Sequence, residues 1–533
     1  MNKFSKLLVA SLALAAISPI SANAVITNPI TLAVIQTYDR QLQANPQDYQ
    51  TYFRRGNEYY RHDEYMRALE DMNQALRYAP VSDTDTRFQA YMIRAGIYNE
   101  TGRAQMALAD LNSAIGLNAD SFAAYNQRAN TQFTLGNISD AKADYQRLMR
   151  MRPNCVEGLL GLARCAVKEN NIGIANDYLE RAVQTDPNNP EVYIRRASVR
   201  KMMSNHNGAV EDLLLAISLN PNDTKAVAAL VDYGNTNYAV TMAGLSNAVN
   251  IAPQNGLYRY LRATIAQAHF NYLSAIDDFE AIIDQRLYDY HGIYASTGWC
   301  LLGLSRYEEA LDKVDHALSM NTNVADYYVL RSKILRALNR HDEAIEAAAQ
   351  AVAVNREYVP GLVEMALNYI DKTDYDQANS LLGEAIMIES SNPELYMLRA
   401  WLLETYMNKP VAARQFYEQV LELEGYLDDD IRSLRGFALI RLDRTAEADT
   451  WINRVLATAQ DNDGLVNYYA ACFYSLRDDS DHAIECVERS LQAGYSDNHN
   501  WMNNTDGFIN AGALRDDLRF LRLMQKYNAI FGR

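Results

Sequence analysis

The chain has 533 residues and a formal net charge of −16, and 49% of its residues are hydrophobic. With only 12 prolines and 24 glycines, this composition is typical of a folded helical chain and excludes a disordered one. The acidic balance argues against nucleic acid or anionic lipid as a partner, because both require a basic face.

The first predicted element is an export signal over residues 1–24. Lys3 and Lys6 precede an apolar stretch, Leu7–Ile17, that is too short to span a bilayer comfortably, and an A-x-A cleavage site follows at 22–24. No cysteine follows the site, so a lipoprotein is not expected, and no later apolar stretch predicts a transmembrane segment in the mature chain. The short, lysine-led signal predicts a bacterial periplasmic protein, with secretion or outer-membrane association as alternatives.

Residues 25–48 are predicted to hold one helix that caps the chain's N-terminal side. Asn28 can cap a helix that continues to Ala44, and Pro29 suits the first turn of that helix.

The dominant feature of residues 49–497 is an alanine that recurs about every 34 residues. A period of this length predicts stacked units, none of which buries its apolar face alone. The recurring residues are Ala68, Ala107, Ala141, Ala175, Ala209, Ala243, Ala275, Ala310, Ala344, Ala378, Ala412, Ala448 and Ala483. A second small residue twelve positions earlier, and often a tyrosine sixteen positions earlier, predict a hairpin of two closely packed helices in each unit.

The first unit carries this pattern in Tyr52, Gly56, Tyr59, Ala68, Met72, Ala75 and Pro80. In these residues the chain resembles the tetratricopeptide repeat family, although the usual Trp-x-x-Leu-Gly opening is altered to Tyr-x-x-Arg-Gly. The resemblance implies an all-α solenoid, a right-handed superhelix of about thirteen helical hairpins with capping helices at its ends. The sixth unit, residues 224–255, fits poorly, so a break or altered stacking is expected near residues 230–256.

Arginines in five units lie sixteen residues before an aspartate, as Arg128 does before Asp144 and Arg196 before Asp212. One interpretation is a ladder of arginines that recognises an anionic ligand. The favoured interpretation is a pair that ties the two helices of one unit together, because arginine and aspartate tend to be missing together.

Nothing in the sequence predicts a catalytic residue, a metal site or a cofactor. His62-Asp63-Glu64 and His341-Asp342-Glu343 fall in turns between helices, where polar residues are routine. The repeats leave no stretch for a separate catalytic domain, so the chain is predicted not to be an enzyme. Of the five cysteines, Cys472 and Cys486 could pair, and buried free thiols are the alternative.

Residues 498–533 are predicted to cap the C-terminal end of the stack. Leu514, Leu518, Leu521 and Met524 have helical spacing, and Trp501 is a further docking residue.

The resemblance places a concave groove along the first helix of each unit. In the later units its positions turn apolar, which predicts a partner-binding strip. The strip consists of Val363, Leu367, Met397, Trp401, Phe437 and Tyr468. The sequence therefore predicts a non-enzymatic scaffold of the cell envelope that binds segments of partner proteins. The alternatives are a glycan- or nutrient-binding protein and a structural part of a secretion or polysaccharide-export complex. A tightened superhelix or an inward-folding tail could instead bury the strip as core.

Overall fold

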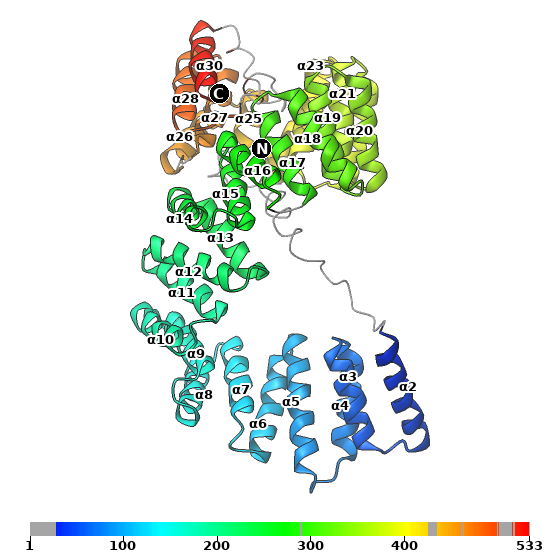
Figure 1. Cartoon of the computed structure of the whole chain (residues 1–533). Helices are drawn as coiled ribbons and strands as arrows, with labels where there is room; N and C mark the ends of the chain where they lie inside the picture. Colours follow the sequence, from blue (N-terminus) through cyan, green and yellow to red (C-terminus); the bar gives the residue numbers. More distant parts are fainter. Residues whose placement is uncertain are drawn as a thin grey trace. The chain divides into compact units, whose positions relative to one another are not determined.

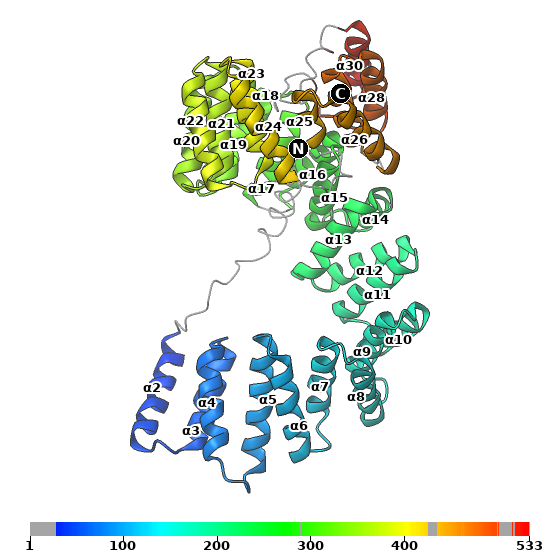
Figure 2. The ribbon, with the colours of Figure 1, turned by 180° about the vertical axis from the view of Figure 1, so that it is seen from behind.

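The computed structural model describes residues 28–287, 290–424, 434–459, 461, 463–497, 499, 501, 514 and 517–531. These residues form 28 α-helices and contain no strand (Figure 1, Figure 2). Consecutive helices are paired in hairpins, so the expected all-α array of helical hairpins is confirmed.

The array divides into two compact units between Leu230 and Val231, inside the range where the sequence predicts a break. Helices of the first unit are α2 (Pro29–Ala44), α3 (Tyr49–Arg61), α4 (Tyr65–Tyr78), α5 (Thr84–Glu100), α6 (Ala104–Leu117), α7 (Phe122–Thr134), α8 (Ile138–Met151), α9 (Val156–Lys168), α10 (Ile172–Thr185), α11 (Pro190–Met202) and α12 (His206–Leu219). Helix α13 (Thr224–Thr236) contains the division.

The second unit continues the same hairpin pattern. Its helices are α14 (Tyr238–Ile251), α15 (Gly256–Ala268), α16 (Tyr272–Asp284), α17 (His291–Gly303), α18 (Tyr307–Met320), α19 (Ala325–Ala337), α20 (His341–Val354), α21 (Val359–Asp371), α22 (Tyr375–Ile388), α23 (Pro393–Thr405), α24 (Pro410–Glu424), α25 (Arg435–Arg441), α26 (Thr445–Thr458), α27 (Leu465–Leu476), α28 (Ser480–Gln492) and α30 (Leu518–Phe531).

The recurring alanines pack between the helices, and a β-carbon built on Gly56 in α3 would lie 3.3 Å from the carbonyl oxygen of Ala68 in α4. Eleven of the thirteen have no exposed surface, and a β-carbon built on Gly56 would lie 2.8 Å from the β-carbon of Asp71. Two assignments were wrong. Ala243 is exposed and Thr241 is fully buried in its place, while Ala413, and not Ala412, is buried in the eleventh unit. In the sixth unit the repeat is thus two residues shorter than the alanine spacing indicates.

The chain's first described helix begins as the sequence predicts. The Asn28 side chain accepts a hydrogen bond from the Ile30 amide at 2.9 Å, and Pro29 is the first helical residue of α2. Ile35 and Leu42 on this helix are buried. The signal-like residues 1–24 lie outside the described residues.

The last described helix, α30, packs against α28, but with a different face from the one expected. Phe520 and Met524 are buried, whereas Leu518 is 67% exposed and Leu521 is 41% exposed. Leu514 is buried but precedes the helix. The buried stripe of the helix is Phe520, Met524 and Tyr527, so Leu514 and Met524 are buried as predicted and Leu518 and Leu521 are not.

All five cysteines are free thiols. Burial raises the pKa of the Cys486 thiol to about 11, consistent with an inert core residue. None of the helices in the described part of the chain combines the length and the hydropathy that a membrane crossing requires.

Candidate functional site

The arginine–aspartate pairs are contacts within single repeats. Arg128 donates through Nε and Nη2 to the two carboxylate oxygens of Asp144, each at 2.8 Å, and Arg196 contacts Asp212 in the same way at 3.0 and 2.6 Å. The other three pairs are Arg55–Asp71, Arg94–Asp110 and Arg262–Asp278. Because each guanidinium is engaged by a buried carboxylate, the interpretation as an anion-binding ladder loses its support.

Each of these arginines also contacts the preceding repeat, which the sequence analysis missed. The Nη1 atom of Arg128 lies 2.9 Å from Asn112 Oδ1, and that of Arg196 lies 2.8 Å from Glu180 Oε2. The corresponding partners are Asp39 for Arg55, Asn73 for Arg94 and Ser246 for Arg262. In four of the five cases a polar residue lies sixteen positions before the arginine, and this spacing could have predicted the contact. Arg94 and Asn73 are 21 residues apart because five extra residues lengthen the connection between the first and second repeats.

Most of the predicted partner-binding strip is buried in the second unit. Met397 has no exposed surface, Phe437 is 1% exposed, and Leu367 and Tyr468 are also buried. Val363 and Trp401 are the two members of the strip that remain half-buried. The structure therefore assigns packing roles to four of the six side chains. Partner binding by the strip stays a prediction, and it now depends on the two accessible residues.

Tyr468 is covered by the chain's own C-terminal residues. Its ring stacks on Tyr495 with centroids 4.8 Å apart and meets Trp501 edge-on at 4.7 Å. Both covering side chains have no exposed surface. At Tyr468 the C-terminal residues therefore fold inward and bury the strip, which was the alternative to partner binding.

The same C-terminal residues contact the α15–α16 hairpin, more than two hundred residues away in sequence. The Tyr272 hydroxyl donates to Asp497 Oδ2 at 3.1 Å, and the Ser496 hydroxyl donates to the carbonyl of Phe270. Phe270 also packs on Tyr495, with ring centroids 4.7 Å apart. The last repeat of the second unit therefore closes onto one of that unit's first hairpins. No local sequence pattern encodes a contact between residues so far apart in the chain, so it could not be predicted.

His499 extends this closure toward α18 and α19. Its Nδ1 atom lies 3.0 Å from the Tyr307 hydroxyl. Burial lowers the pKa of His499 to about 3, and the nearby cations Arg336 and Lys333 act in the same direction. The imidazole is therefore neutral in the folded chain at ordinary pH.

A buried carboxylate sits beside those two cations. Glu364 on α21 is 2% exposed, and one of its oxygens lies 2.8 Å from Lys333 Nζ. Burial alone would raise the pKa of Glu364, but the charges of Lys333 and Arg336 outweigh burial and hold that pKa below its usual value. This arrangement is a compensated ion pair joining α19 to α21.

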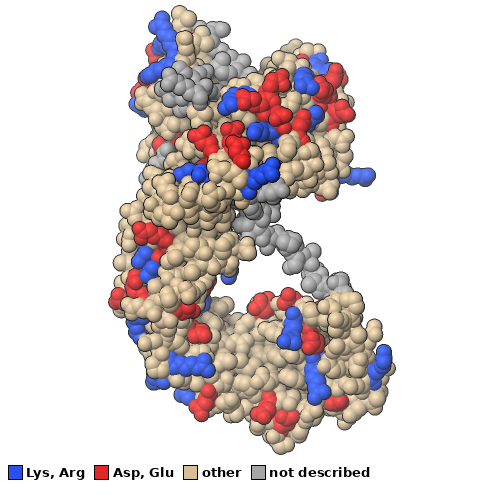
Figure 3. Space-filling view, in the orientation of Figure 1, with Lys and Arg blue, Asp and Glu red and all other residues tan. Residues whose placement is uncertain are grey.

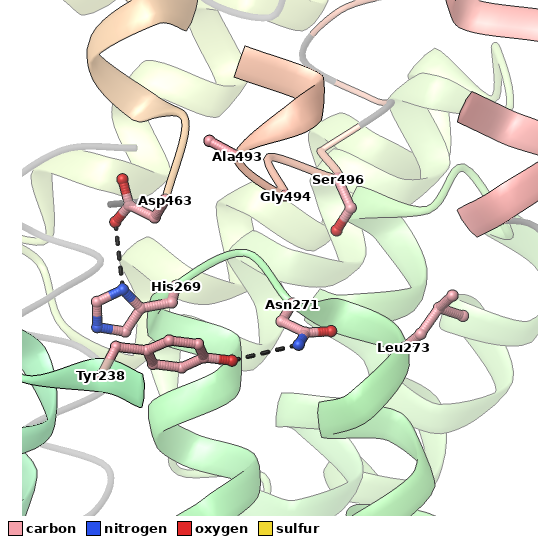
Figure 4. Close-up of a pocket in the computed structure, with 8 residues that line it drawn as sticks. All are labelled: Tyr238, His269, Asn271, Leu273, Asp463, Ala493, Gly494 and Ser496. Carbon is pink, nitrogen blue, oxygen red and sulfur yellow. Dashed lines mark hydrogen bonds and ion pairs between the residues drawn. The ribbon is translucent and has the colours of Figure 1, made fainter. Parts of the chain in front are cut away.

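Closure also creates a small polar pocket of about 160 Å³ (Figure 4). Its lining residues are Tyr238, His269, Asn271, Leu273, Asp463, Ala493, Gly494 and Ser496. They come from the start of α14, the α15–α16 turn, the turn before α27 and the segment after α28. His269 is 6% exposed, while Asn271 and Ala493 are exposed and mark the side open to solvent.

The turn that carries Asp463 is held tightly against the end of α28. Gly464 has a φ of 79°, and a β-carbon built there would lie 2.2 Å from the Ser490 carbonyl oxygen. The Ser490 hydroxyl in turn donates to the Gly464 carbonyl at 2.7 Å. Only glycine fits this position, and it fixes Asp463 at the rim of the pocket.

The histidine-containing turns singled out in the sequence do not assemble into a common centre. His62 ends α3 and lies 3.4 Å from Thr31 Oγ1, whereas His341 begins α20 and contacts Asn368. Among the residues that the structure describes, no group of three or more His, Cys, Asp and Glu side chains could hold a metal ion.

Surface charge in the second unit is mixed. Acidic and basic side chains are interspersed over α18–α20 (Figure 3), and they include the ion pairs Arg306–Glu309 at 2.6 Å and Arg340–Glu343 at 2.7 Å. Exposed pairs of this kind contribute little to stability.

Comparisons with known proteins agree with the hairpin geometry. The tetratricopeptide repeat family matches residues 53–122, 126–190 and 325–358. The chain is 28% identical over 205 residues to Tetratricopeptide repeat protein 16 of Macaca fascicularis, covering 36% of this chain and 24% of that protein. It is 23% identical over 329 residues to the DnaJ homolog subfamily C member 7 homolog of Schizosaccharomyces pombe, covering 57% and 64%. The chain thus spans about a quarter of the length of the first of these relatives.

Solved structures with a similar arrangement include yeast Tom70 and the Cut9–Hcn1 hetero-tetramer of the APC/C. Tom70 is 15% identical, with coverage of 75% of this chain and 96% of that chain and a TM-score of 0.35. Cut9–Hcn1 is 13% identical, with coverage of 93% and 99% and a TM-score of 0.32. The chain thus contains tetratricopeptide repeats in the matched segments, and the repeat period and the helical hairpins continue the same pattern through the rest of the described array.

Proposed function

We propose that this protein is an exported, non-enzymatic scaffold of the cell envelope, which holds segments of partner proteins on the first helices of its hairpins. The export signal read from residues 1–24 supports the location. Arrays of helical hairpins present extended surfaces, and such surfaces suit extended or helical partner segments.

One observation carries the binding proposal: the periodic residues are buried between helices, whereas many of the variable residues on the first helices stay accessible. Eleven of the recurring alanines have no exposed surface, and the arginine–aspartate pairs lie between helices. At Leu367, Met397, Phe437 and Tyr468 the residues that change from repeat to repeat on the first helices are buried. At many other such positions they are partly or well exposed. They include Phe53, Asn57, Tyr60, Asn126, Phe133, Ile194, Ser198, Lys201, Val363 and Trp401. Variation on an accessible face over an invariant core is what recognition by a scaffold requires.

Trp401 is the best anchor that remains accessible. It is half-buried and meets Tyr406 edge-on with ring centroids 5.1 Å apart, which holds the indole in place. A rigid aromatic side chain with part of its area free is typical of binding hot spots.

Site-specific photo-crosslinking in intact cells tests the proposal. A photoreactive residue at Trp401 should capture one discrete protein, and the same residue at Met387, which is 79% exposed on α22, should not. Equal capture at both positions, or capture of a glycan at position 401, would contradict the scaffold. N-terminal sequencing of the mature protein checks export, and the expected first residue is Val25.

A further inference from the structure

Arg164, on the first helix α9, lacks the carboxylate partner that the five paired arginines have. Its Nη1 atom donates to Asn130 Oδ1 on α7 at 3.1 Å, and its guanidinium lies over the Phe133 ring, 4.1 Å from the centroid. None of the described carboxylates forms an ion pair with Arg164, which is half-buried. The guanidinium is therefore held in place on an accessible face, and most of its N–H donors remain available.

The side-chain amide of Asn130 is oriented so that it also presents donors. A guanidinium can only donate, so the Asn130 atom that faces Arg164 is the carbonyl oxygen. The same oxygen accepts a hydrogen bond from the Tyr145 hydroxyl at 2.8 Å, and burial raises the pKa of this phenol to about 12, so the hydroxyl keeps its hydrogen. Both lone pairs of the oxygen are used, whereas the Asn130 NH₂ group donates to none of the described residues. A group that satisfies Arg164 and Asn130 together must be an acceptor.

Arg195, on the next first helix α11, brings a second guanidinium to the same place. The charges of Arg164 and Arg195 both lower the pKa of Tyr145 against the larger effect of burial, so both guanidinium groups lie near its hydroxyl. Arg195 Nη2 pairs with Glu191 Oε1 at 2.5 Å, while its Nε atom is buried and donates to none of the described residues. Two cations and one carboxylate leave an excess of positive charge.

The accessible positions around Arg164 contain no carboxylate that could compensate this charge. The groove positions of α7, α9 and α11 lie one, five and eight residues after Tyr125, Leu159 and Tyr193. All nine are partly or well exposed, none is Asp or Glu, and the charged residues among them are Arg164 and Lys201. In a chain whose net charge is −16, this face has the opposite sign to the whole. Charge complementarity therefore favours an acidic partner segment.

We propose that the surface formed by Asn130, Arg164 and Arg195 binds an Asp or Glu side chain within a partner segment. The carboxylate accepts from the Arg164 guanidinium, which can pair with it bidentately, and from the Asn130 NH₂ group. Binding of such a segment presupposes the scaffold function proposed above and adds the chemistry of one segment. This surface lies in the first unit and Trp401 in the second, so the two tests give separate answers.

Titration of the full chain at pH 7.5 with a terminally blocked peptide of alternating Glu and Ala tests the surface, with the matched Gln and Ala peptide as the control. The Glu peptide should bind saturably and about fivefold or more tightly than the Gln peptide at low salt. Arg164→Gln should remove this preference. Arg152→Gln should keep it within about twofold, because Arg152 also lies over a phenylalanine ring but at the end of α8.

Each unfavourable result has its own meaning. Equal binding of the two peptides by the wild type would overturn the acidic segment and leave the scaffold standing. A preference that survives in Arg164→Gln would overturn the role of this surface. No saturable binding of either peptide would also overturn it, and capture at Trp401 would then decide the scaffold separately.

A second measurement uses the wild-type protein alone and covers the case in which Arg164→Gln fails to fold. The Glu peptide with a central benzoylphenylalanine should crosslink to α7, α9 or α11, and crosslinks confined to other helices would contradict the site. A Gln peptide with a free C-terminal carboxylate that binds more tightly than the blocked Glu peptide would assign the surface to chain ends and overturn the proposal. Self-association of the wild type that the Glu peptide does not compete with would assign it to a second copy, with the same consequence.

Discussion

The two units are built from the same repeat, but different contacts stabilise the interior of each. In the first unit, four arginine–aspartate pairs each join a hairpin internally and reach back to the preceding hairpin, around several small apolar clusters. In the second unit one apolar cluster of described residues runs from Tyr260 to Tyr527. Of the five arginine–aspartate pairs described above, only Arg262–Asp278 lies in this unit. In the first unit the contacts described above join each repeat to the next one, whereas in the second unit the last repeat also packs on the α15–α16 hairpin.

This difference has a thermodynamic consequence. In an open array each repeat is stabilised by itself and its neighbours, so damage stays local. Where the last repeat also packs on an early hairpin, damage at one end reaches the other. The second unit should therefore unfold more cooperatively than the first.

The largest expected effect comes from removing the side chain at the centre of the closure. Trp501→Ala should destabilise the second unit by about 3–5 kcal/mol, because a fully buried indole that packs on Tyr468 and Phe520 is lost. Chemical denaturation followed by circular dichroism measures this change. Leu518→Ala, at an exposed position on α30, is the control and should change stability by less than about 0.5 kcal/mol.

A slightly smaller effect is expected in the first unit. Asp212→Ala should cost about 3 kcal/mol, because it leaves the 8%-exposed Arg196 beside a cavity without its main partner. Replacing both residues, Arg196→Met with Asp212→Leu, should recover most of the loss. Denaturation of the single and double variants decides the point, and equal loss in both would mean that packing, and not charge, is what the pair supplies.

The closure should weaken in mild acid through His499. Its pKa lies below that of an unfolded histidine, so the unfolded chain takes up a proton first and stability falls as the pH drops from about 6.5 towards 3. Between pH 7 and pH 5 the wild type should lose about 2 kcal/mol more than His499→Gln. Parallel stability–pH curves for the two proteins would show that His499 does not titrate in this way.

Asp326 should act with the opposite sign. Burial raises its pKa to about 6, so the folded chain favours the neutral acid and stability falls as the pH rises from about 4 through 6. The hydrogen bond from the Tyr358 hydroxyl favours the ionised form and so opposes the effect of burial. Stability of the wild type measured relative to Asp326→Asn should decrease over this range, and an increase would refute the assignment.

Periodic features of the fold could be predicted from the sequence, and contacts that depend on the stack's closure could not. The Arg128–Asp144 pair and the Asn28 cap follow from fixed spacing along helices, so local geometry determines them. The burial of Tyr468 depends on where Tyr495 and Trp501 fold, and these contacts follow no helical period. The assignment of Ala243 was wrong because an alanine happens to lie two residues after the buried position, which Thr241 occupies.

Native-state hydrogen exchange on the wild type and Trp501→Ala tests the closed second unit most directly. If the last repeat holds the α15–α16 hairpin, the variant should lose amide protection in α27 and α28 and, by a similar amount, in α15, α16 and the turn at Phe270. Helices α3–α10 should keep theirs. Loss of protection confined to α27, α28 and α30, with α15 and α16 unchanged, would show that the second unit is an open array and contradict the account.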